Sequence, residues 1–214
     1  MMEPDGDAPR VHPTAIVEAG VQLGARTAVW DGVHLRGPSS IGQDCIIGEK
    51  TYIAYGVSVG NYVKVNAHVY ICTGITIEDR VFIGAGVVFT NDRYPRAFRD
   101  GFERLAPSEP TAETLETVVH RGATIGAGAR IGAGIEIGPY AMVGMGSIVT
   151  HAVPPHGLVF GTPARLQGYV CICGAPFKCV DRDNGAQKEA SACERCGRRY
   201  AFAEGHGLTL RPHD

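Results

Sequence analysis

Apolar residues recur at every sixth position along most of the chain. The series runs from Val17 to Phe89, stops, and resumes from Val119 to Val149. Every position in it is apolar although only 44% of the chain is, so the series is a genuine repeat. Its members are Val17, Leu23, Val29, Leu35, Ile41, Ile47, Ile53, Val59, Val65, Ile71, Ile77, Ile83 and Phe89, then Val119, Ile125, Ile131, Ile137, Val143 and Val149.

The period of six favours strands over helices. It is a multiple of two, so every repeated residue can point to the same side of a strand, whereas an amphipathic helix needs a period of 3.6. Glycine often follows a repeated residue, as at Gly24, Gly48 and Gly84, where a tight corner needs a backbone that is costly for other residues. The pattern therefore predicts short parallel strands joined by corners, whose stacked coils bury a continuous aliphatic column.

The break in the repeat predicts a long surface loop over residues 90–118. It begins within the segment VVFTNDRYPRAF and exceeds the ~12–15 residues beyond which structureless loops are usually functional or disordered. Its arginines, including Arg93 and Arg96, could bind phosphate or carboxylate groups. A solvated loop, balanced by acidic residues such as Asp92 and Glu109, is the alternative.

Charge and hydropathy exclude several classes of partner. A formal net charge of −2 argues against a general nucleic-acid or membrane-surface binder. No apolar run approaches the ~20 residues needed to cross a bilayer. The first ten residues lack the pattern of a signal peptide and predict a flexible tail. We therefore expect a cytoplasmic protein that binds neither nucleic acid nor membrane.

Cysteines crowd the last quarter of the chain. Cys171-x-Cys173-Gly and Cys193-x-x-Cys196-Gly resemble the two halves of a four-thiolate zinc ribbon, although the first pair is one residue shorter than usual. Four thiolates would fill the coordination sphere, so the zinc would be structural. A redox dithiol is the alternative, and Cys179 would be a spare or would replace Cys171.

The segments VHPTAIVEAGVQLG, ATIGAGARIGAGIEIG and LVFGTPAR resemble the hexapeptide-repeat acyltransferases. This resemblance implies an all-β fold, a left-handed parallel β-helix, and usually a homotrimer with acetyl-CoA bound between subunits. We therefore expect a flexible tail at 1–10, a β-helix acetyltransferase domain at 11–168 with its inserted loop at 90–118, and a zinc ribbon with a tail at 169–214.

Finer detail points to one branch of that family. The order VHPTAIV, AVWDGVHL and ITIEDRVFIGAGVVFTNDRYPR resembles bacterial N-acetyltransferases that act on nucleotide-linked 3-amino sugars for polysaccharide or glycoside biosynthesis, with matches at Asn91, Pro95 and Arg96. The segment KVNAHVY departs from the Gln-Asn-Asn that such enzymes often carry. The implied substrates are acetyl-CoA and a nucleotide-linked amino sugar, with a 3-amino sugar favoured.

The segment AVWDGVHLRG also resembles γ-class carbonic anhydrases, which need three zinc-binding histidines on their coils. Here Arg36-Gly37 is followed by Pro38, and the later coils ATIGAGARIGAGIEIGPYAMVG contain no histidine. Without imidazoles converging on one metal, the pKa of a bound water cannot be lowered. This alternative is therefore disfavoured.

Two residues are candidates for catalysis. The resemblance implies that Asn91 contacts the substrate amine, and a neutral amide suits this role because a neutral amine is already a good nucleophile that mainly needs positioning. Asn91 could instead simply turn the chain. His68, three residues after Val65, is the alternative base, which would suit a hydroxyl acceptor or another small amine. It could equally be a solvated histidine.

The resemblance also implies binding residues. We expect His34, Arg96 and Arg93 to bind substrate, although His34 could lie on an outer strand face. Small residues on the later coils would let the pantetheine of acetyl-CoA lie against bare backbone, although tight coils need small residues too. The expected cofactor residues are Gly126, Ala127, Gly144, Gly146, Ser147, Gly161, Thr162, Pro163 and Arg165. A non-catalytic scaffold with a docking ribbon is the remaining alternative.

Overall fold

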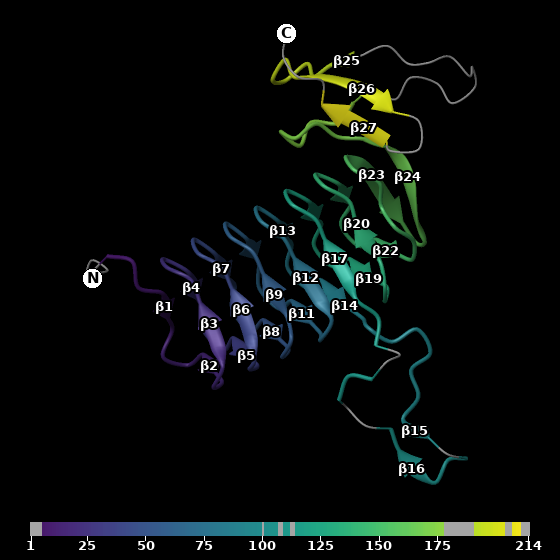
Figure 1. Ribbon diagram of the computed structural model, residues 1–214. Helices are drawn as coiled ribbons and strands as arrows, with labels where there is room; N and C mark the ends of the chain where they lie inside the picture. The colour runs from purple at the N-terminus through teal and green to yellow at the C-terminus, as the bar shows by residue number, and fades with distance from the viewer. Residues whose placement is uncertain are drawn as a thin grey trace.

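The chain folds into a stack of β-coils with a smaller β-module at the C-terminal end (Figure 1). The computed structural model describes residues 6–99, 101–106, 109–111, 114–177, 191–203 and 207–210. Over these residues the regular elements are all β-strands, and none is a helix long and apolar enough to cross a membrane.

Three sheets form the sides of the coils. Sheet A contains β1 (Arg10–Val11), β4 (Ala28–Val29), β7 (Ile46–Ile47), β10 (Lys64–Val65), β13 (Phe82–Ile83), β18 (Thr124–Ile125), β21 (Met142–Val143), β23 (Gly157–Gly161) and β24 (Ala164–Tyr169). Sheet B contains β2 (Ile16–Val17), β5 (His34–Leu35), β8 (Tyr52–Ile53), β11 (Tyr70–Ile71), β14 (Val88–Phe89), β19 (Arg130–Ile131) and β22 (Ile148–Val149). Sheet C contains β3 (Val21–Leu23), β6 (Ser39–Ile41), β9 (Ser58–Val59), β12 (Ile75–Ile77), β17 (Thr117–Val119) and β20 (Glu136–Ile137).

Successive coils pair in parallel and in register. In sheet A, for example, Ile46 pairs with Lys64 and Lys64 with Phe82. Every member of the six-residue series from Val29 to Val149 is buried, as the periodicity predicts. Val17 differs, with 38% of its surface exposed, because it belongs to the open end of the stack, where no preceding coil covers it.

The corners of the coils approach one another too closely for side chains. A Cβ at Gly42 would lie 2.5 Å from the carbonyl oxygen of Gly60 on the next coil, closer than any real contact. Glycine at such positions is therefore required by coil stacking. At another corner His68 adopts a left-handed backbone with φ of 58°, and its N–H donates to the Glu49 carbonyl at 2.9 Å.

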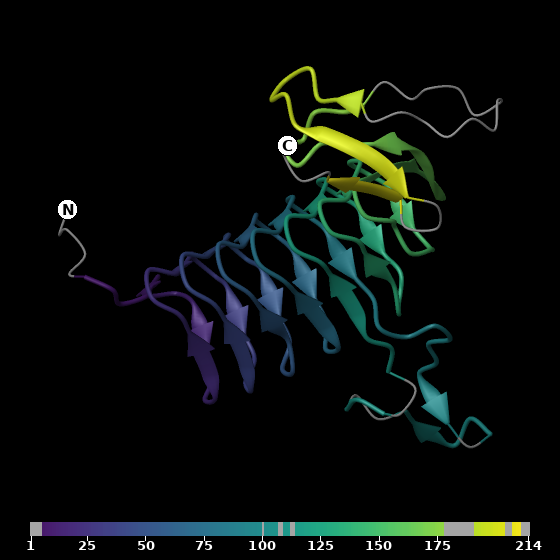
Figure 2. The same cartoon turned by 45° about the horizontal axis from the view of Figure 1, so that its top comes forward.

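The inserted loop leaves the stack after β14 and returns at β17. It carries an antiparallel hairpin of β15 (Phe98–Arg99) and β16 (Arg104–Leu105) and projects away from the coils (Figures 1 and 2). The returning chain is fastened where it re-enters the stack, since the Leu115 N–H donates to the Asn91 carbonyl at 3.0 Å and the Thr117 N–H to the Gly74 carbonyl at 2.9 Å.

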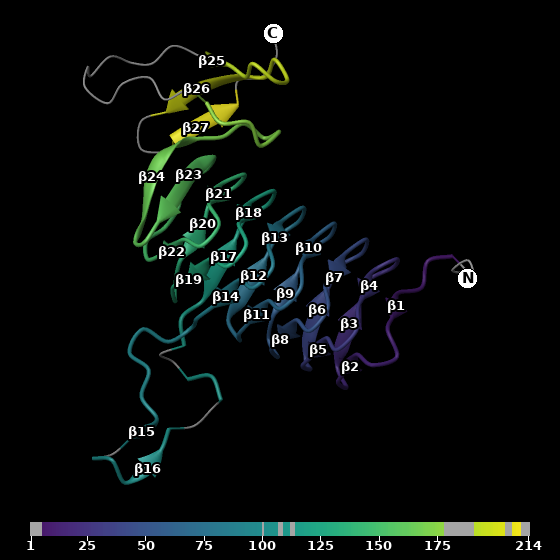
Figure 3. The same ribbon diagram turned by 180° about the vertical axis from the view of Figure 1, so that it is seen from behind.

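The C-terminal end of the stack is closed by the antiparallel pair β23 and β24. The module beyond it contains β25 (Ser191–Ala192), β26 (Arg199–Ala203) and β27 (Gly207–Leu210). It lies at the opposite end of the stack from the N-terminus (Figure 3). The expected all-β fold, a parallel β-helix with an inserted loop and a C-terminal four-cysteine cluster, is therefore confirmed.

Candidate active site and four-cysteine cluster

A cavity of about 580 Å³ lies between the outer face of sheet B and the inserted loop. The β-helix contributes Arg36, Tyr52, Ala54, Tyr55, Tyr70, Cys72 and Thr73 to its wall, and the loop contributes Asn91, Asp92, Tyr94, Pro95, Arg96, Phe98, Ala106, Glu109, Pro110, Thr111 and Thr114. The volume is that of a small-molecule binding site. The segment at which the repeat breaks therefore forms one wall of the cavity.

Asn91 lies where the loop leaves the stack and lines the cavity. Its Nδ2 donates to the Thr73 carbonyl of the previous coil at 3.0 Å, while its own carbonyl holds Leu115 at the other end of the loop. In the described part of the chain, the side-chain oxygen of Asn91 is paired with no protein donor. The amide is thus fixed by the scaffold, and its oxygen can accept a hydrogen bond from a ligand.

The cavity also holds a thiol and a carboxylate that the sequence did not single out as site residues. Cys72 is buried, and that burial raises the pKa of its thiol to about 11. It is therefore a neutral thiol at physiological pH, not an activated nucleophile. Asp92 follows Asn91 directly and is exposed at the cavity wall.

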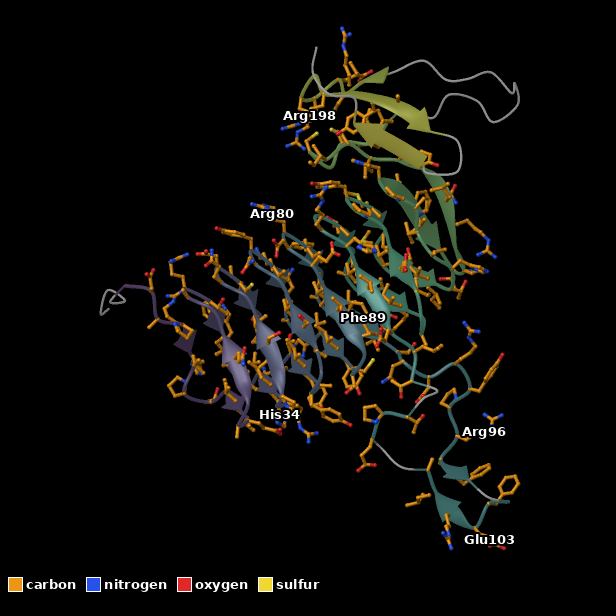
Figure 4. The ribbon with its side chains drawn as sticks, viewed as in Figure 1. His34, Arg80, Phe89, Arg96, Glu103 and Arg198 are labelled. Atoms are coloured by element: carbon orange, nitrogen blue, oxygen red, sulfur yellow. The ribbon has the colours of Figure 1, made fainter. Side chains whose placement is uncertain are left out.

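The two loop arginines expected to bind substrate differ in position. Arg96 lines the cavity, and its Nη1 donates to the carbonyl of the adjacent Pro95 at 3.0 Å. Arg93 is exposed and is not among the residues that line the cavity. Figure 4 shows Arg96 on the loop and His34 on the β-helix.

His34 lies on the outer face of sheet B, next to the cavity but not in its wall. Its Nε2 lies 2.8 Å from Oε1 of Glu18. The hydrogen bond from His34, followed by that from Arg36, holds the pKa of the Glu18 carboxyl below its usual value. His34 thus supports the cavity wall from behind, through Glu18 to Arg36 and through an edge-to-face contact with the Tyr52 ring, 5.5 Å between ring centres.

His68 and Asn91 are on different corners of the coil. His68 precedes the sheet B strand β11, whereas Asn91 follows the sheet B strand β14, so the width of sheet B separates the two columns. His68 is exposed and lies outside the cavity wall. Its neighbour Ala67 lines a shallower cleft of about 250 Å³ together with Trp30 and Gly48. A single copy of the chain does not bring the two candidate catalytic residues together.

The column of corners that runs through Gly32, Lys50 and His68 continues beyond His68 as bare glycine. Gly86, Gly128 and Gly146 have φ of 68°, 70° and 67°, and a Cβ at any of them would meet nothing within 4 Å. Arg130 fastens the column, since its Nη1 donates to the carbonyls of Gly86 and Gly128 at 2.9 and 2.7 Å. Gly86 and Gly128 could not be singled out from the sequence because only their shared corner distinguishes them from other glycines.

The other expected cofactor residues lie in the last coils and in the hairpin that closes the stack. A Cβ at Gly126 would meet Met145 N at 2.5 Å and one at Gly144 would meet Phe160 Cβ at 2.7 Å, so both glycines are needed for coil stacking. The closing motif turns between β23 and β24: Gly161, Thr162, Pro163 and Arg165 lie at this hairpin, and Ala127 lies at the corner beside Gly128. Ser147 is buried, and its hydroxyl accepts from the Gly161 N–H at 3.3 Å, which ties the hairpin to the last coils.

The four predicted cysteines converge. The Sγ atoms of Cys171, Cys173, Cys193 and Cys196 all lie within 4.8 Å of one another, with 3.4 Å between Cys171 and Cys196 and 3.7 Å between Cys173 and Cys193. Tetrahedral zinc at ~2.3 Å from each sulfur places the sulfurs roughly 3.8 Å apart, so the donor set and its geometry fit zinc. Cys179 lies outside the described residues.

The chain is similar in sequence to proteins of known type. A family model described as the hexapeptide repeat of succinyl-transferase matches residues 38–73, 67–91 and 118–151. The dTDP-3-amino-3,6-dideoxy-alpha-D-galactopyranose 3-N-acetyltransferase of Aneurinibacillus thermoaerophilus is 42% identical over 89 residues, which are 42% of this chain and 42% of that one. The bifunctional protein GlmU of Rubrobacter xylanophilus is 27% identical over 182 residues, 70% of this chain and 39% of the relative. The chain thus spans less than half of either curated relative.

A solved structure is similar in fold. AntD, an N-acyltransferase from Bacillus cereus, was solved as a single-site variant in complex with dTDP and coenzyme A. It superposes with a TM-score of 0.57 at 18% identity, covering 74% of this chain and 91% of AntD. At this identity the likeness concerns the fold.

Proposed function

We propose that this chain, as a hexapeptide-repeat protein, is an acetyl-CoA-dependent N-acetyltransferase for the amino group of a nucleotide-linked amino sugar, with a 3-amino sugar favoured. One observation carries the proposal: Asn91, at the break in the repeat, is fixed by two hydrogen bonds in the wall of a cavity large enough for such a substrate. The similarity to a dTDP-3-amino-sugar 3-N-acetyltransferase over 89 residues supports the substrate class.

The chemistry asks for positioning more than for a strong base. The neutral amine nitrogen attacks the thioester carbonyl carbon, the C–N bond forms, the tetrahedral intermediate collapses and the C–S bond breaks. The nitrogen gives up one proton, and the coenzyme A thiolate or water takes it. The side-chain amide oxygen of Asn91 would accept a hydrogen bond from the amine and fix its line of attack, a contribution that lies within the ~7–11 kcal/mol available from orientation.

We propose that acetyl-CoA lies along the glycine corner formed by Gly86, Gly128 and Gly146. These left-handed positions leave open space against bare backbone, which suits the peptide-like pantetheine arm. Because sheet B separates this corner from the cavity within one copy, the proposal requires that neighbouring copies supply the two halves of each site. A homotrimer meets that requirement, since a closed ring repeats one heterologous contact.

We propose that the four clustered cysteines bind a structural Zn²⁺. A filled four-thiolate sphere offers no position for substrate, so the metal would stabilise the C-terminal module and take no part in acetyl transfer. A module this small buries little core and would depend on the metal to fold.

The decisive experiment is an assay of UDP- and dTDP-linked 3-amino and 4-amino sugars with acetyl-CoA, following release of free coenzyme A. Asn91→Ala should lower kcat/KM by about 10- to 100-fold, while the melting temperature changes little because the backbone carbonyl that holds Leu115 remains. His68→Ala is the companion variant. If His68→Ala alone abolishes turnover, the proposed role of Asn91 is wrong.

The second candidate function is acetylation of another small-molecule amine or hydroxyl with His68 as base. Its supporting observation is that His68 stands at the head of the open glycine corner, where a bound thioester could reach it. Turnover of a hydroxyl acceptor that depends on His68 and is indifferent to Asn91→Ala would favour this alternative.

A further inference from the structure

Arg36 is held on the β-helix wall of the cavity by residues of the preceding and following coils. Glu18 Oε1 lies 2.8 Å from its Nε. Its Nη1 donates to the Tyr52 hydroxyl at 3.3 Å, and its guanidinium carbon lies 5.6 Å from the centre of the Tyr55 ring. His34 in turn holds Glu18. The guanidinium therefore reaches forward to the next coil, which carries Tyr52 and Tyr55. Contacts with the coils on both sides hold it in place.

The guanidinium retains donors for a ligand. Of its five N–H groups, Nε faces Glu18 and one on Nη1 faces Tyr52. Within the described residues, no other protein acceptor is paired with it. The side chain is 38% exposed and lines the cavity. Two N–H groups side by side on a planar fork suit the oxygens of a phosphate better than any neutral group.

Arg36 and Asn91 both line the cavity, at different positions along the stack. Tyr55, Thr73 and Asn91 form one column, because the Thr73 hydroxyl donates to the Tyr55 carbonyl at 2.9 Å and Asn91 Nδ2 donates to the Thr73 carbonyl at 3.0 Å. Tyr55, whose ring the Arg36 guanidinium faces, is therefore two coil steps of ~4.8 Å, or about 10 Å along the stack, from Asn91. Ala54, one coil after Arg36, also lines the cavity and has a small side chain.

Tyr70 lies on β11, between the strand of Tyr52 and the strand β14 that precedes Asn91. Its ring stacks on Tyr52 with 5.3 Å between ring centres and 8° between ring planes. The next position in that column is Val88, which carries no ring, so the aromatic column ends at Tyr70. Tyr70 is 45% exposed and lines the cavity. An aromatic face of this kind suits the C–H groups of a sugar ring.

We propose that Arg36 binds the diphosphate of the nucleotide-linked sugar, with the sugar ring over Tyr70 and its amino group at Asn91. This inference rests on the proposed function of the same cavity. One sugar ring fits between a diphosphate and an amine that are two coil steps apart. His34 and Glu18 act as positioning residues that hold the guanidinium, and Arg96 adds a second cation from the loop.

The test uses nucleoside diphosphates alone, so that binding is measured without turnover. Titration calorimetry of the full chain with dTDP and with UDP should show a loss of about 10- to 100-fold in affinity for Arg36→Gln. Arg36→Lys keeps the charge but not the fork, so its loss should be smaller. Arg80→Gln is the matched control: Arg80 also lies over a tyrosine ring, at 5.2 Å from that of Tyr62, on the opposite edge of the β-helix (Figure 4). The Arg80→Gln variant should bind dTDP and UDP as tightly as the unmodified chain.

The two proposals fail in different ways. If Arg36→Gln binds dTDP and UDP as tightly as the unmodified chain, or if the unmodified chain binds neither, Arg36 is no diphosphate anchor. If diphosphate binding depends on Arg36 but no amino sugar is acetylated, the anchor stands and the proposed reaction is wrong. Equal melting temperatures for the Arg36 and Arg80 variants would exclude misfolding as the cause of a loss.

Discussion

The ring of Tyr200, in the four-cysteine module, meets the ring of His156, in the last coil, edge to face, with 5.3 Å between their centres. Tyr200 is also bound to the cysteine cluster, since its hydroxyl lies 3.0 Å from Cys171 Sγ and accepts from the Ile172 N–H at 3.0 Å. His156 is buried, and its Nδ1 lies 2.9 Å from the Val170 carbonyl. One buried tyrosine therefore connects the four cysteines to the end of the β-helix.

Metal removal is expected to loosen this end of the molecule and leave the coils intact. Elemental analysis should find one zinc ion per unmodified chain and none in the Cys173→Ser or Cys193→Ser variant. Hydrogen exchange should then accelerate at the amides of Val170, Cys171 and Gly174, whose bonds order the first half of the module. The amide of Lys64 in mid-stack should remain protected. Unchanged zinc content in both variants would contradict the assignment of the ligands.

Acid should weaken the same contact. Burial lowers the pKa of His156 below its usual value of 6.5, so the unfolded chain binds a proton at a higher pH than the folded chain does. The contribution of neutral His156 to stability is therefore complete above about pH 6.5 and is lost as the pH falls below it towards the folded pKa. Melting temperature should fall more steeply between pH 7 and pH 5 in the unmodified chain than in His156→Phe. The comparison isolates His156, because any loss of stability caused by protonation of the cysteine cluster occurs in both chains. Identical pH profiles would show that His156 does not titrate in this range.

The glycine corner can be tested with a control that has the same backbone. Gly128 and Gly101 have φ of 70° and 69°, and a Cβ at either would meet nothing within 4 Å. Leucine at either position costs ~1–2 kcal/mol for the left-handed conformation, but only Gly128→Leu fills the proposed path of the pantetheine. Calorimetry should show acetyl-CoA affinity reduced by tenfold or more in Gly128→Leu and unchanged in Gly101→Leu. Equal affinities in the two variants would show that acetyl-CoA does not lie along this corner.

The coils could be predicted from the sequence because their burial is periodic: Val29, Ile83 and Val149 follow one rule, and each is buried as that rule requires. The convergence of the four cysteines could be predicted because two closely spaced cysteine pairs are typical of a metal site. The break at Asn91 also located the loop that forms one wall of the cavity. Each of these features depends on a local or periodic pattern that can be recognised in the sequence.

What could not be predicted depends on contacts between coils or between modules. Arg36 meets Tyr52 and Glu18 only because the register places their coils side by side, and nothing in its immediate sequence distinguishes it from other arginines. The contact of His156 with Tyr200 joins the last coil to a module without a repeat, so no period indicates it.

The proposal that two copies share each site gives a quantitative prediction. In a trimer, each site would combine the Asn91 wall of one copy with the Gly128 corner of its neighbour. Measured alone below saturating substrate, Asn91→Ala and Gly128→Leu should each retain about a tenth of the unmodified activity or less. Co-expression of the two in equal amounts gives mixed trimers. A site is intact when the first copy retains Asn91 and the second retains Gly128, so roughly a quarter of the unmodified activity should return with random mixing.

The control is a chain carrying both substitutions, mixed with an equal amount of the unmodified chain. Intact sites then need two adjacent unmodified copies, which again gives roughly a quarter of the unmodified activity with random mixing. If each site instead belonged to one copy, the two single variants would restore nothing on mixing, while the doubly substituted chain mixed with the unmodified chain would retain about half. The pair of mixtures therefore distinguishes a shared site from one contained in a single chain, independently of which amino sugar is used.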